Sequence, residues 1–250
     1  RPPFLAQNSS SIEIDKIVMS DTVTTVYIKA FYRPKYWIKI ATGSVLKDNN
    51  GILYPIRKGI GITLDKEFWM PESGEAEFQL TFPPIPQNVT RLDFSEGDFE
   101  GAYKIWGIQL DKKSFGKFKL PKDVIVPKAD HKMTLPDPIV KYDKAILKGR
   151  ILDYQKGMPD KGSLYYQDVI REGAQEGKIR IQDDGTFYHE MNVFMITPCT
   201  IMFPFGTIEY LLAPGETTSI VINLRENARK QSHLRQTEKP YGKEVYYGGY

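Results

Sequence analysis

Few side chains in this 250-residue chain have the chemistry of a catalytic or metal-binding group. Cys199 is the only cysteine, and the three histidines are His131, His189 and His233. A thiol-disulfide exchange centre needs a second thiol, and the common zinc sites need several cysteine or histidine ligands. We therefore expect no internal disulfide, no metal site, no cofactor and no enzymatic activity in this chain. A stand-alone enzyme is the least favoured alternative, because no catalytic set of residues supports it.

Two of these residues lie in predicted strands and are interpreted as structural. Cys199 follows a proline and shares a strand face with Ile201 and Phe203. Free cysteines are among the most buried residue types, so a core position is expected. His189 is in phase with the apolar residues of segment 186–194. We expect a buried, hydrogen-bonded or strand-end histidine, with a general base or metal ligand as the alternative.

Acidic side chains cluster in one loop, at Asp93, Glu96, Asp98 and Glu100. Calcium takes several oxygen ligands from a single loop, but this spacing does not match the EF-hand pattern. Gly97 indicates an ordinary turn. His131 and His233 lie in polar, Lys-rich segments and are expected to be solvated.

Aromatic residues are the strongest indication of a binding surface. Trp37 lies between two lysines on the more polar face of its strand, close to Tyr32 and Tyr36, and Trp69 lies in a loop-like segment. Exposed aromatic side chains can mark a surface that binds a glycan, a peptide or a protein partner. We favour the interpretation that these residues cover the ends of a sandwich or pack between domains, because large aromatic residues usually bury most of their area, and the binding surface is the alternative.

The composition excludes two classes of protein. Lys and Arg number 34 against 31 Asp and Glu, which leaves a net charge of only +3 without a basic cluster typical of nucleic-acid binding. No apolar run approaches the roughly 20 residues that span a bilayer. We therefore expect neither nucleic acid as a partner nor a membrane span.

Alternation with a period of two residues predicts many half-buried strands and an all-β fold class. The clearest case is segment 75–82, where Ala76, Phe78, Leu80 and Phe82 alternate with polar residues. Turn signals separate the strands, among them Asp48-Asn49-Asn50-Gly51, Asp183-Asp184-Gly185 and Ala213-Pro214-Gly215.

These patterns predict two β-sandwich domains. Residues 1–110 are expected to form an Ig-like sandwich, and residues 145–225 a smaller transthyretin- or Ig-like one. Residues 111–144 contain nine lysines and four prolines and are interpreted as a linker, with an edge strand at 124–126 as an option. Residues 226–250 are expected to form a C-terminal tail or a short helix.

Several segments carry a resemblance to a known family. They are residues 32–37, 51–54, 64–76, 78–86 and 94–98, followed by 147–150, 184–187 and 212–216. Together they resemble the N-terminal region of TlpA-like thiol-disulfide oxidoreductases of Bacteroidetes, in which a β-rich module of unknown function often precedes a thioredoxin domain.

The resemblance implies an exported protein of the periplasm or cell envelope. This chain lacks the CxxC motif of the thioredoxin domain, so it is interpreted as a non-catalytic module with a positioning or recruiting role. A thioredoxin-like domain would follow it in a longer parent protein, unless the chain is a stand-alone relative. In this family setting, Thr22 in Asp21-Thr22-Val23 matches an O-glycosylation acceptor pattern.

Overall fold

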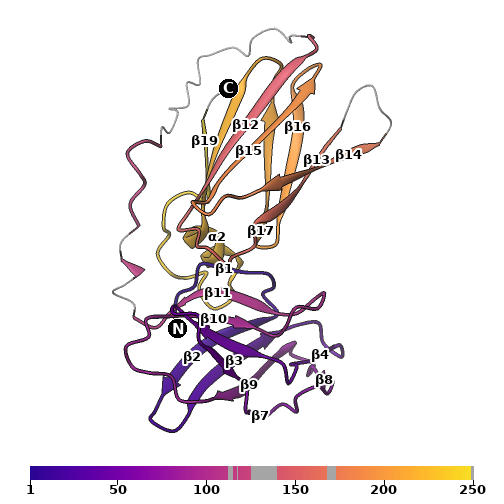
Figure 1. Cartoon of the computed structure of the whole chain (residues 1–250). Coiled ribbons are helices and arrows are strands. Elements are labelled where there is room, and N and C mark those ends of the chain that lie inside the picture. Colours follow the sequence, from indigo (N-terminus) through magenta and orange to yellow (C-terminus); the bar gives the residue numbers. More distant parts are fainter. Residues whose placement is uncertain (112–114, 117, 125–139, 168–172, 249–250) are drawn as a thin grey trace. The chain divides into compact units, whose positions relative to one another are not determined.

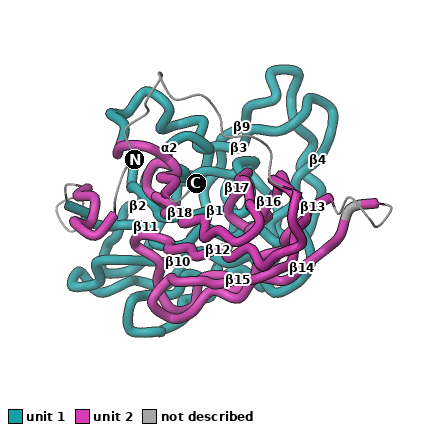
Figure 2. The backbone as a smooth tube through the Cα atoms, turned by 90° about the horizontal axis from the view of Figure 1, so that it is seen from above, with its two compact units in different colours: residues 1–117, 227–240 teal, residues 118–226, 241–250 magenta. Residues whose placement is uncertain are grey.

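A computed structural model describes residues 1–111, 115–116, 118–124, 140–167 and 173–248 (Figure 1). The described residues form two compact units of β-structure (Figure 2). Unit 1 contains residues 1–117 and 227–240, and unit 2 contains residues 118–226 and 241–250. Each unit is built mainly from two sheets whose strands pair antiparallel, apart from one parallel pair in unit 2, so the expected all-β fold with two sandwiches is confirmed.

Unit 1 contains a five-stranded and a four-stranded sheet. The first has the order β1 (Ala6–Gln7), β11 (Lys104–Gln109), β10 (Arg91–Ser95), β5 (Val45–Asp48) and β6 (Leu53–Pro55). The second has the order β2 (Ile12–Met19), β3 (Thr24–Phe31), β9 (Glu75–Phe82) and β7 (Lys58–Ile60). A separate two-stranded ladder joins β4 (Trp37–Ile38) and β8 (Phe68–Trp69).

Side chains from both larger sheets form one core in unit 1. Phe78, Leu80 and Phe82 of β9 are buried, as the alternation predicted, and they belong to the same cluster as Phe94 of β10 and Ile105 of β11. A buried, interdigitated layer of this kind is the usual interior of a two-sheet sandwich.

The predicted turn at 48–51 connects β5 and β6. Gly51 has a φ of +86°, a value that glycine adopts without steric strain. The carboxylate of Asp48 accepts hydrogen bonds from the N–H groups of Asn50 (2.8 Å) and Ile52 (2.9 Å) and from the hydroxyl of Tyr54 (3.1 Å). This buried carboxylate therefore organises the turn.

Unit 2 contains two four-stranded sheets. One has the order β15 (Thr186–Val193), β12 (Asp143–Leu152), β18 (Thr217–Asn223) and β19 (Val245–Gly248). The other has the order β14 (Ala174–Arg180), β13 (Lys161–Gln167), β16 (Thr197–Phe203) and β17 (Gly206–Leu212). Rings from the two sheets meet in the core, where Phe187 and Phe203 have centroids 5.5 Å apart.

The C-terminal region contains the short helix that was one of the two expected options, and it does not form a tail. Helix α2 (Leu224–Gln231) begins in unit 2 and ends in unit 1, and Ala228 lies in the core of unit 1. The chain then returns to unit 2, where β19 pairs with β18. Residues 226–248 are thus integral parts of the two units. Local patterns did not reveal this, because the partners of these residues are distant in sequence.

The other domain boundaries also differ from the sequence interpretation. Unit 1 extends to residue 117 rather than 110, and β12 begins at Asp143 rather than 145. Most of the predicted 111–144 linker, including residues 125 and 126 of the optional edge strand, lies outside the described residues, as does His131.

Candidate functional site

The segment that follows β3 is held in place by the segment that contains β8. The N–H of Tyr32 donates to the carbonyl of Gly74 (3.0 Å), and the N–H of Lys35 donates to the carbonyl of Met70 (3.2 Å). Gly74 has a φ of +70°, and a Cβ added there would lie 2.8 Å from the carbonyl oxygen of Tyr32. A glycine is therefore required where the two segments meet.

The short ladder between β4 and β8 has one buried and one exposed face. Ile38 and Met70 are buried and anchor the two segments in the core. Trp37 and Trp69 are directly opposite in the ladder and are 44% and 60% exposed. Opposite residues of an antiparallel pair project from the same face, so both tryptophans project on the solvent side.

A cavity of about 500 Å³, which we call the aromatic groove, opens beside Trp37. Its lining residues are Tyr32, Tyr36, Trp37, Ile38, Lys39, Glu96, Phe99, Glu100, Gly101 and Tyr103. The structure thus brings together three of the four aromatic residues singled out from the sequence. The fourth, Trp69, does not line the groove although it lies opposite Trp37.

Tyr36 is more exposed than the sequence pattern predicted. The alternation placed it on one face with Ile38 and Ile40, yet Tyr36 is 54% exposed while both isoleucines are buried. A turn interrupts the alternation here, because the N–H of Tyr36 donates to the carbonyl of Arg33 (3.2 Å) and Lys35 has a φ of +63°.

Local contacts orient the Tyr36 ring. The rings of Tyr32 and Tyr36 meet edge to face, with centroids 6.3 Å apart and an interplanar angle of 89°. The guanidinium of Arg33 lies 5.8 Å from the centroid of the Tyr36 ring, within the range of a cation–π contact. The tyrosine is therefore restrained before any ligand arrives.

The opposite wall of the groove comes from the loop between β10 and β11. Glu96 is buried there, and its two carboxylate oxygens accept the N–H groups of Ala41 (2.9 Å) and Tyr103 (3.0 Å). Burial raises the pKa of Glu96, and these two N–H donors oppose the rise. Burial also raises the pKa of Tyr103 to about 12, so its phenol is neutral at physiological pH.

Chemically, the groove combines flat apolar surfaces with charged groups at its rim. The rings of Tyr36, Trp37 and Phe99 offer faces to a ligand, while Lys39 and Glu100 are exposed hydrogen-bonding groups. A few polar groups around an apolar, largely preformed cavity are typical of small-ligand sites. The groove is suited to binding, and it presents neither a nucleophile–base pair nor two facing carboxylates.

The acidic loop does not form a cation site in the described structure. Asp93 accepts the N–H of Gly107 (2.7 Å), and Asp98 pairs with Lys104 (2.8 Å). Among the described residues, no group of three or more His, Cys, Asp or Glu side chains is arranged to hold a metal ion.

The two residues predicted to be structural lie in unit 2. Cys199 is buried, and burial raises the pKa of its thiol to about 12. His189 is half-buried rather than fully buried, it packs near Gly177, and burial lowers its pKa. Neither lies in the aromatic groove.

The remaining candidates lie elsewhere on the surface. Thr22 is exposed in the turn between β2 and β3, where its hydroxyl is 3.4 Å from that of Ser20. Its glycosylation stays a prediction. His233 is exposed, as expected, and its ring stacks on Phe31 at 4.5 Å.

Sequence reasoning missed part of the groove. Phe99 and Tyr103 were not identified as binding residues, because they lie more than 60 residues away from Trp37, and Lys39 was noticed only as a neighbour of Trp37. The acidic loop at 93–100 was noticed for its charge, yet its contribution is a wall that contains Glu96 and Phe99.

Comparisons with known proteins were made for the whole chain. No protein-family model and no curated protein matches it. Among solved structures, it is similar to pullulanase type I from Bacillus subtilis str. 168 (9% identity, TM-score 0.29, 80% of this chain and 24% of that chain). It is also similar to pullulanase from Anoxybacillus sp. LM18-11 (10% identity, TM-score 0.29, 79% of this chain and 25% of that chain). A third similar structure is the Bacillus anthracis TIE protein (9% identity, TM-score 0.23, 86% of this chain and 41% of that chain).

The chain spans about a quarter of the length of these pullulanase chains. We base no argument about ligand or activity on these similarities. Among the described residues, no helix is long and apolar enough to cross a membrane.

Proposed function

We propose that this chain is a non-catalytic binding module and that unit 1 binds a carbohydrate in the aromatic groove. The observation that carries the proposal is the exposure of Tyr36 and Trp37 in positions that backbone hydrogen bonds hold in place. Large aromatic side chains usually bury most of their area, so a restrained cluster of exposed rings calls for a ligand that covers it.

A sugar ring matches the chemistry of this groove. The C–H groups on one face of a pyranose pack against an aromatic ring, while its hydroxyl groups donate to and accept from charged side chains. Lys39 and Glu100 supply such groups at the rim. The backbone bonds that hold Tyr32 and Tyr36 reduce the ordering that binding would otherwise require.

The test is a titration of the purified chain with neutral α- and β-linked glucose, xylose and mannose trisaccharides. Binding is followed by isothermal titration calorimetry and tryptophan fluorescence. Trp37→Ala and Tyr36→Ala are each expected to weaken binding about tenfold or more, given the usual contribution of a buried aromatic contact. Leu53→Ala is the control, because Leu53 is an exposed apolar residue of unit 1 that does not line the groove.

Equal losses for Trp37→Ala and Leu53→Ala would contradict the proposal. If no trisaccharide binds but a peptide rich in proline and aromatic residues does so in a Trp37-dependent manner, the groove is a peptide site instead.

A role next to a thioredoxin-like domain is the second proposal. The segments 32–37 and 64–76, which carry the resemblance to TlpA-like proteins, are also the segments that build the β4–β8 ladder and its tryptophans. In an exported parent protein, the groove would recruit a ligand to the envelope. Sequencing the reading frame beyond residue 250 tests this arrangement.

A further inference from the structure

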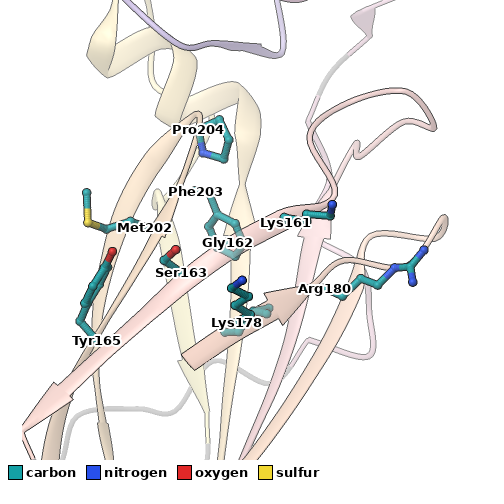
Figure 3. Close-up of a pocket in the computed structure, with 10 residues that line it drawn as sticks. Lys161, Gly162, Ser163, Tyr165, Lys178, Arg180, Met202, Phe203 and Pro204 are labelled. Atoms are coloured by element: carbon teal, nitrogen blue, oxygen red, sulfur yellow. The ribbon is translucent and has the colours of Figure 1, made fainter. Parts of the chain in front are cut away.

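Unit 2 contains a second groove, of about 560 Å³, which shares no lining residue with the aromatic groove (Figure 3). Its lining comes from β13, β14 and the end of β16, and comprises Lys161, Gly162, Ser163, Tyr165, Lys178, Ile179, Arg180, Met202, Phe203 and Pro204. We call it the cationic groove. Its volume lies within the range of about 300–1,000 Å³ typical of small-molecule sites.

The register of β13 explains why the groove opens here. β13 pairs with β16 from Ser163 to Tyr166, but Lys161 and Gly162 extend beyond the end of that ladder. The ring of Phe203 occupies the space beside Gly162, where an added Cβ would lie 2.7 Å from the ring. The 49% exposed side chain of Met202 and the half-buried ring of Tyr165 give the groove an apolar floor. Phe203 and Ile179 point to the buried face of the sheet, because successive residues of a strand alternate between its two faces.

Three cationic side chains surround this floor. Lys161 lies directly opposite Arg180 in the β13–β14 ladder, and Ser163 lies opposite Lys178. Like charges directly opposite each other in a ladder are destabilising. Lys161, Lys178 and Arg180 are all exposed, and the three cations are drawn together in Figure 3.

The carboxylates of the described residues do little to neutralise these cations. Within the described part of the chain, the ion pair formed by this set joins Arg180 to Asp160 at 3.9 Å, the limit of an ion pair. Neither Lys161 nor Lys178 forms an ion pair with a described carboxylate. Glu176 lies in the same strand as Lys178, opposite Tyr165, and does not line the groove.

We propose that the cationic groove binds a small amphiphilic organic anion, whose charged head pairs with Lys161, Lys178 and Arg180 and whose apolar body packs on Met202 and Tyr165. An anion relieves the repulsion between Lys161 and Arg180, and the exposed Met202 is covered by the apolar body. The head group is a carboxylate or a phosphate ester, since lysine and arginine pair with both. This proposal does not rest on the carbohydrate site of unit 1.

The experiment measures binding of decanoate and decyl phosphate by isothermal titration calorimetry, at concentrations below micelle formation. Decanol tests the apolar body without the charge, inorganic phosphate tests the charge without the apolar body, and trigalacturonate represents an acidic oligosaccharide. The variants are Lys178→Glu and Arg180→Glu, with Lys148→Glu as the matched control because Lys148 is exposed in the other sheet of unit 2.

The proposal expects decanoate or decyl phosphate to bind, with each groove variant weakening binding about tenfold or more. Lys148→Glu should leave binding unchanged. Arg180→Glu removes the repulsion with Lys161 and also replaces the weak attraction to Asp160 with repulsion, so thermal melts should show a stability close to that of the parent. This separates lost binding from lost structure.

Equal binding of decanol would overturn the role of the cations, and equal binding of inorganic phosphate would overturn the role of the apolar floor. Tighter binding of trigalacturonate than of either decyl anion would overturn the proposed ligand class. A loss of affinity in Lys148→Glu equal to that in the groove variants would overturn the proposed location of the site.

Discussion

Trp37 and Trp69 lie directly opposite each other in the ladder of β4 and β8, yet only Trp37 lines the aromatic groove. The two residues share a face because opposite residues of an antiparallel pair project to the same side. Their unequal access to the groove arises from the loop between β10 and β11, which contributes Glu96 and Phe99 on the side of Trp37. This asymmetry makes the two tryptophans separable by experiment.

Trp69→Ala should therefore reduce carbohydrate affinity less than Trp37→Ala. Trp69 supports its neighbour across the ladder, and a cross-strand pair of this kind contributes about 0.2–1 kcal/mol. Calorimetric titration of both variants with the same trisaccharide gives the comparison, and urea unfolding gives the stability change. A larger affinity loss for Trp69→Ala would place the ligand over Trp69 and outside the groove.

Asp48 should make the stability of unit 1 depend on pH in the acidic range. Burial acts to raise its pKa, but the N–H groups of Ile52 and Asn50 and the hydroxyl of Tyr54 lower it below the ordinary value. Because the pKa is lower in the folded state than in the unfolded state, the ionised carboxylate stabilises the fold above the unfolded-state pKa. That contribution is lost as the pH falls through the folded-state pKa.

Melting temperatures measured between pH 6 and pH 2.5 check this expectation. The parent should lose stability below about pH 4, the ordinary range of an aspartate. Asp48→Asn should be less stable at neutral pH by about 1 kcal/mol and should show a shallower acid dependence. Asp21→Asn is the control at an exposed position, and an equal flattening of its profile would argue against Asp48 as the source.

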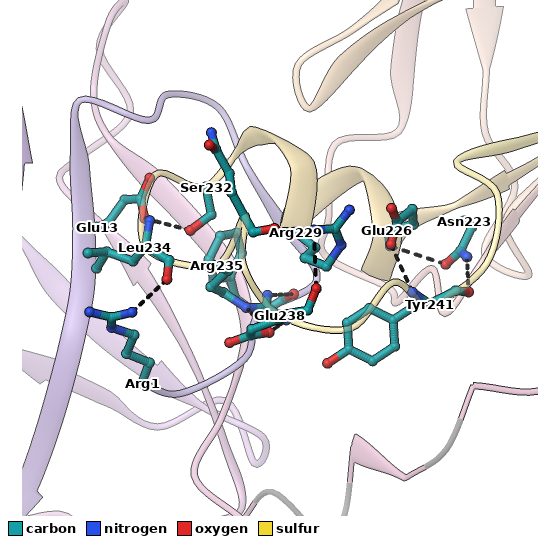
Figure 4. Close-up of polar contacts among 12 residues, drawn as sticks. Arg1, Glu13, Asn223, Glu226, Arg229, Ser232, Leu234, Arg235, Glu238 and Tyr241 are labelled. Carbon is teal, nitrogen blue, oxygen red and sulfur yellow. Dashed lines mark hydrogen bonds and ion pairs between the residues drawn. The ribbon is translucent and has the colours of Figure 1, made fainter.

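Glu13 should be essential for docking of the C-terminal segment into unit 1 (Figure 4). This buried carboxylate accepts the hydroxyl of Ser232 (2.6 Å) and the N–H groups of His233 (2.6 Å) and Leu234 (3.1 Å). Glu13→Gln replaces one acceptor oxygen with a donor and should lower the free energy of unfolding by about 1.5–3 kcal/mol. Glu13→Ala removes all the acceptors and should destabilise the fold more.

Chemical denaturation of unit 1, followed by tryptophan fluorescence, measures these changes, since all three tryptophans (Trp37, Trp69, Trp106) belong to unit 1. Glu77→Gln is the control, because the Glu77 side chain is 72% exposed and pairs with Lys29 at the surface. Such exposed pairs contribute little. A glutamine variant at position 13 that is as stable as the control would show that the segment docks without the carboxylate.

Cys199 should be unreactive in the folded chain. Its thiol is buried opposite Tyr210 in the β16–β17 ladder, and burial raises its pKa to about 12, so the reactive thiolate is scarce at neutral pH. Modification by a disulfide reagent at pH 7.5 should be slow in buffer and complete within minutes in denaturant. Rapid labelling of the folded chain would mean that the thiol is accessible.

Substitutions at the same position test its packing. Cys199→Ala should lower the free energy of unfolding by about 1 kcal/mol through a small cavity. Cys199→Asp should be far more destabilising, because it places an unpaired charge in the core. Similar stabilities of the two variants would contradict the core position.

Local sequence patterns alone determined the strands and several of their turns. Segment 75–82 is strand β9 with the predicted face buried, and the turns at 48–51, 183–185 and 213–215 connect neighbouring strands. The pattern also placed Trp37 on the more polar face of its strand, although burial against a sandwich end or another domain was the favoured interpretation, and Trp37 is 44% exposed. These features follow from the two-residue period of a strand and the backbone freedom of glycine, which act over a few residues.

The tertiary structure alone decided which distant residues meet. The aromatic groove requires that segment 32–39 lie beside the loop 96–103, and the cationic groove requires the register that sets Lys161 opposite Arg180. The segment 227–240, which returns to unit 1, is hydrogen-bonded there to the buried carboxylate of Glu13, more than 200 residues earlier. Pairing between segments this far apart is determined by packing of the whole core, and a local pattern of residues carries no information about that packing.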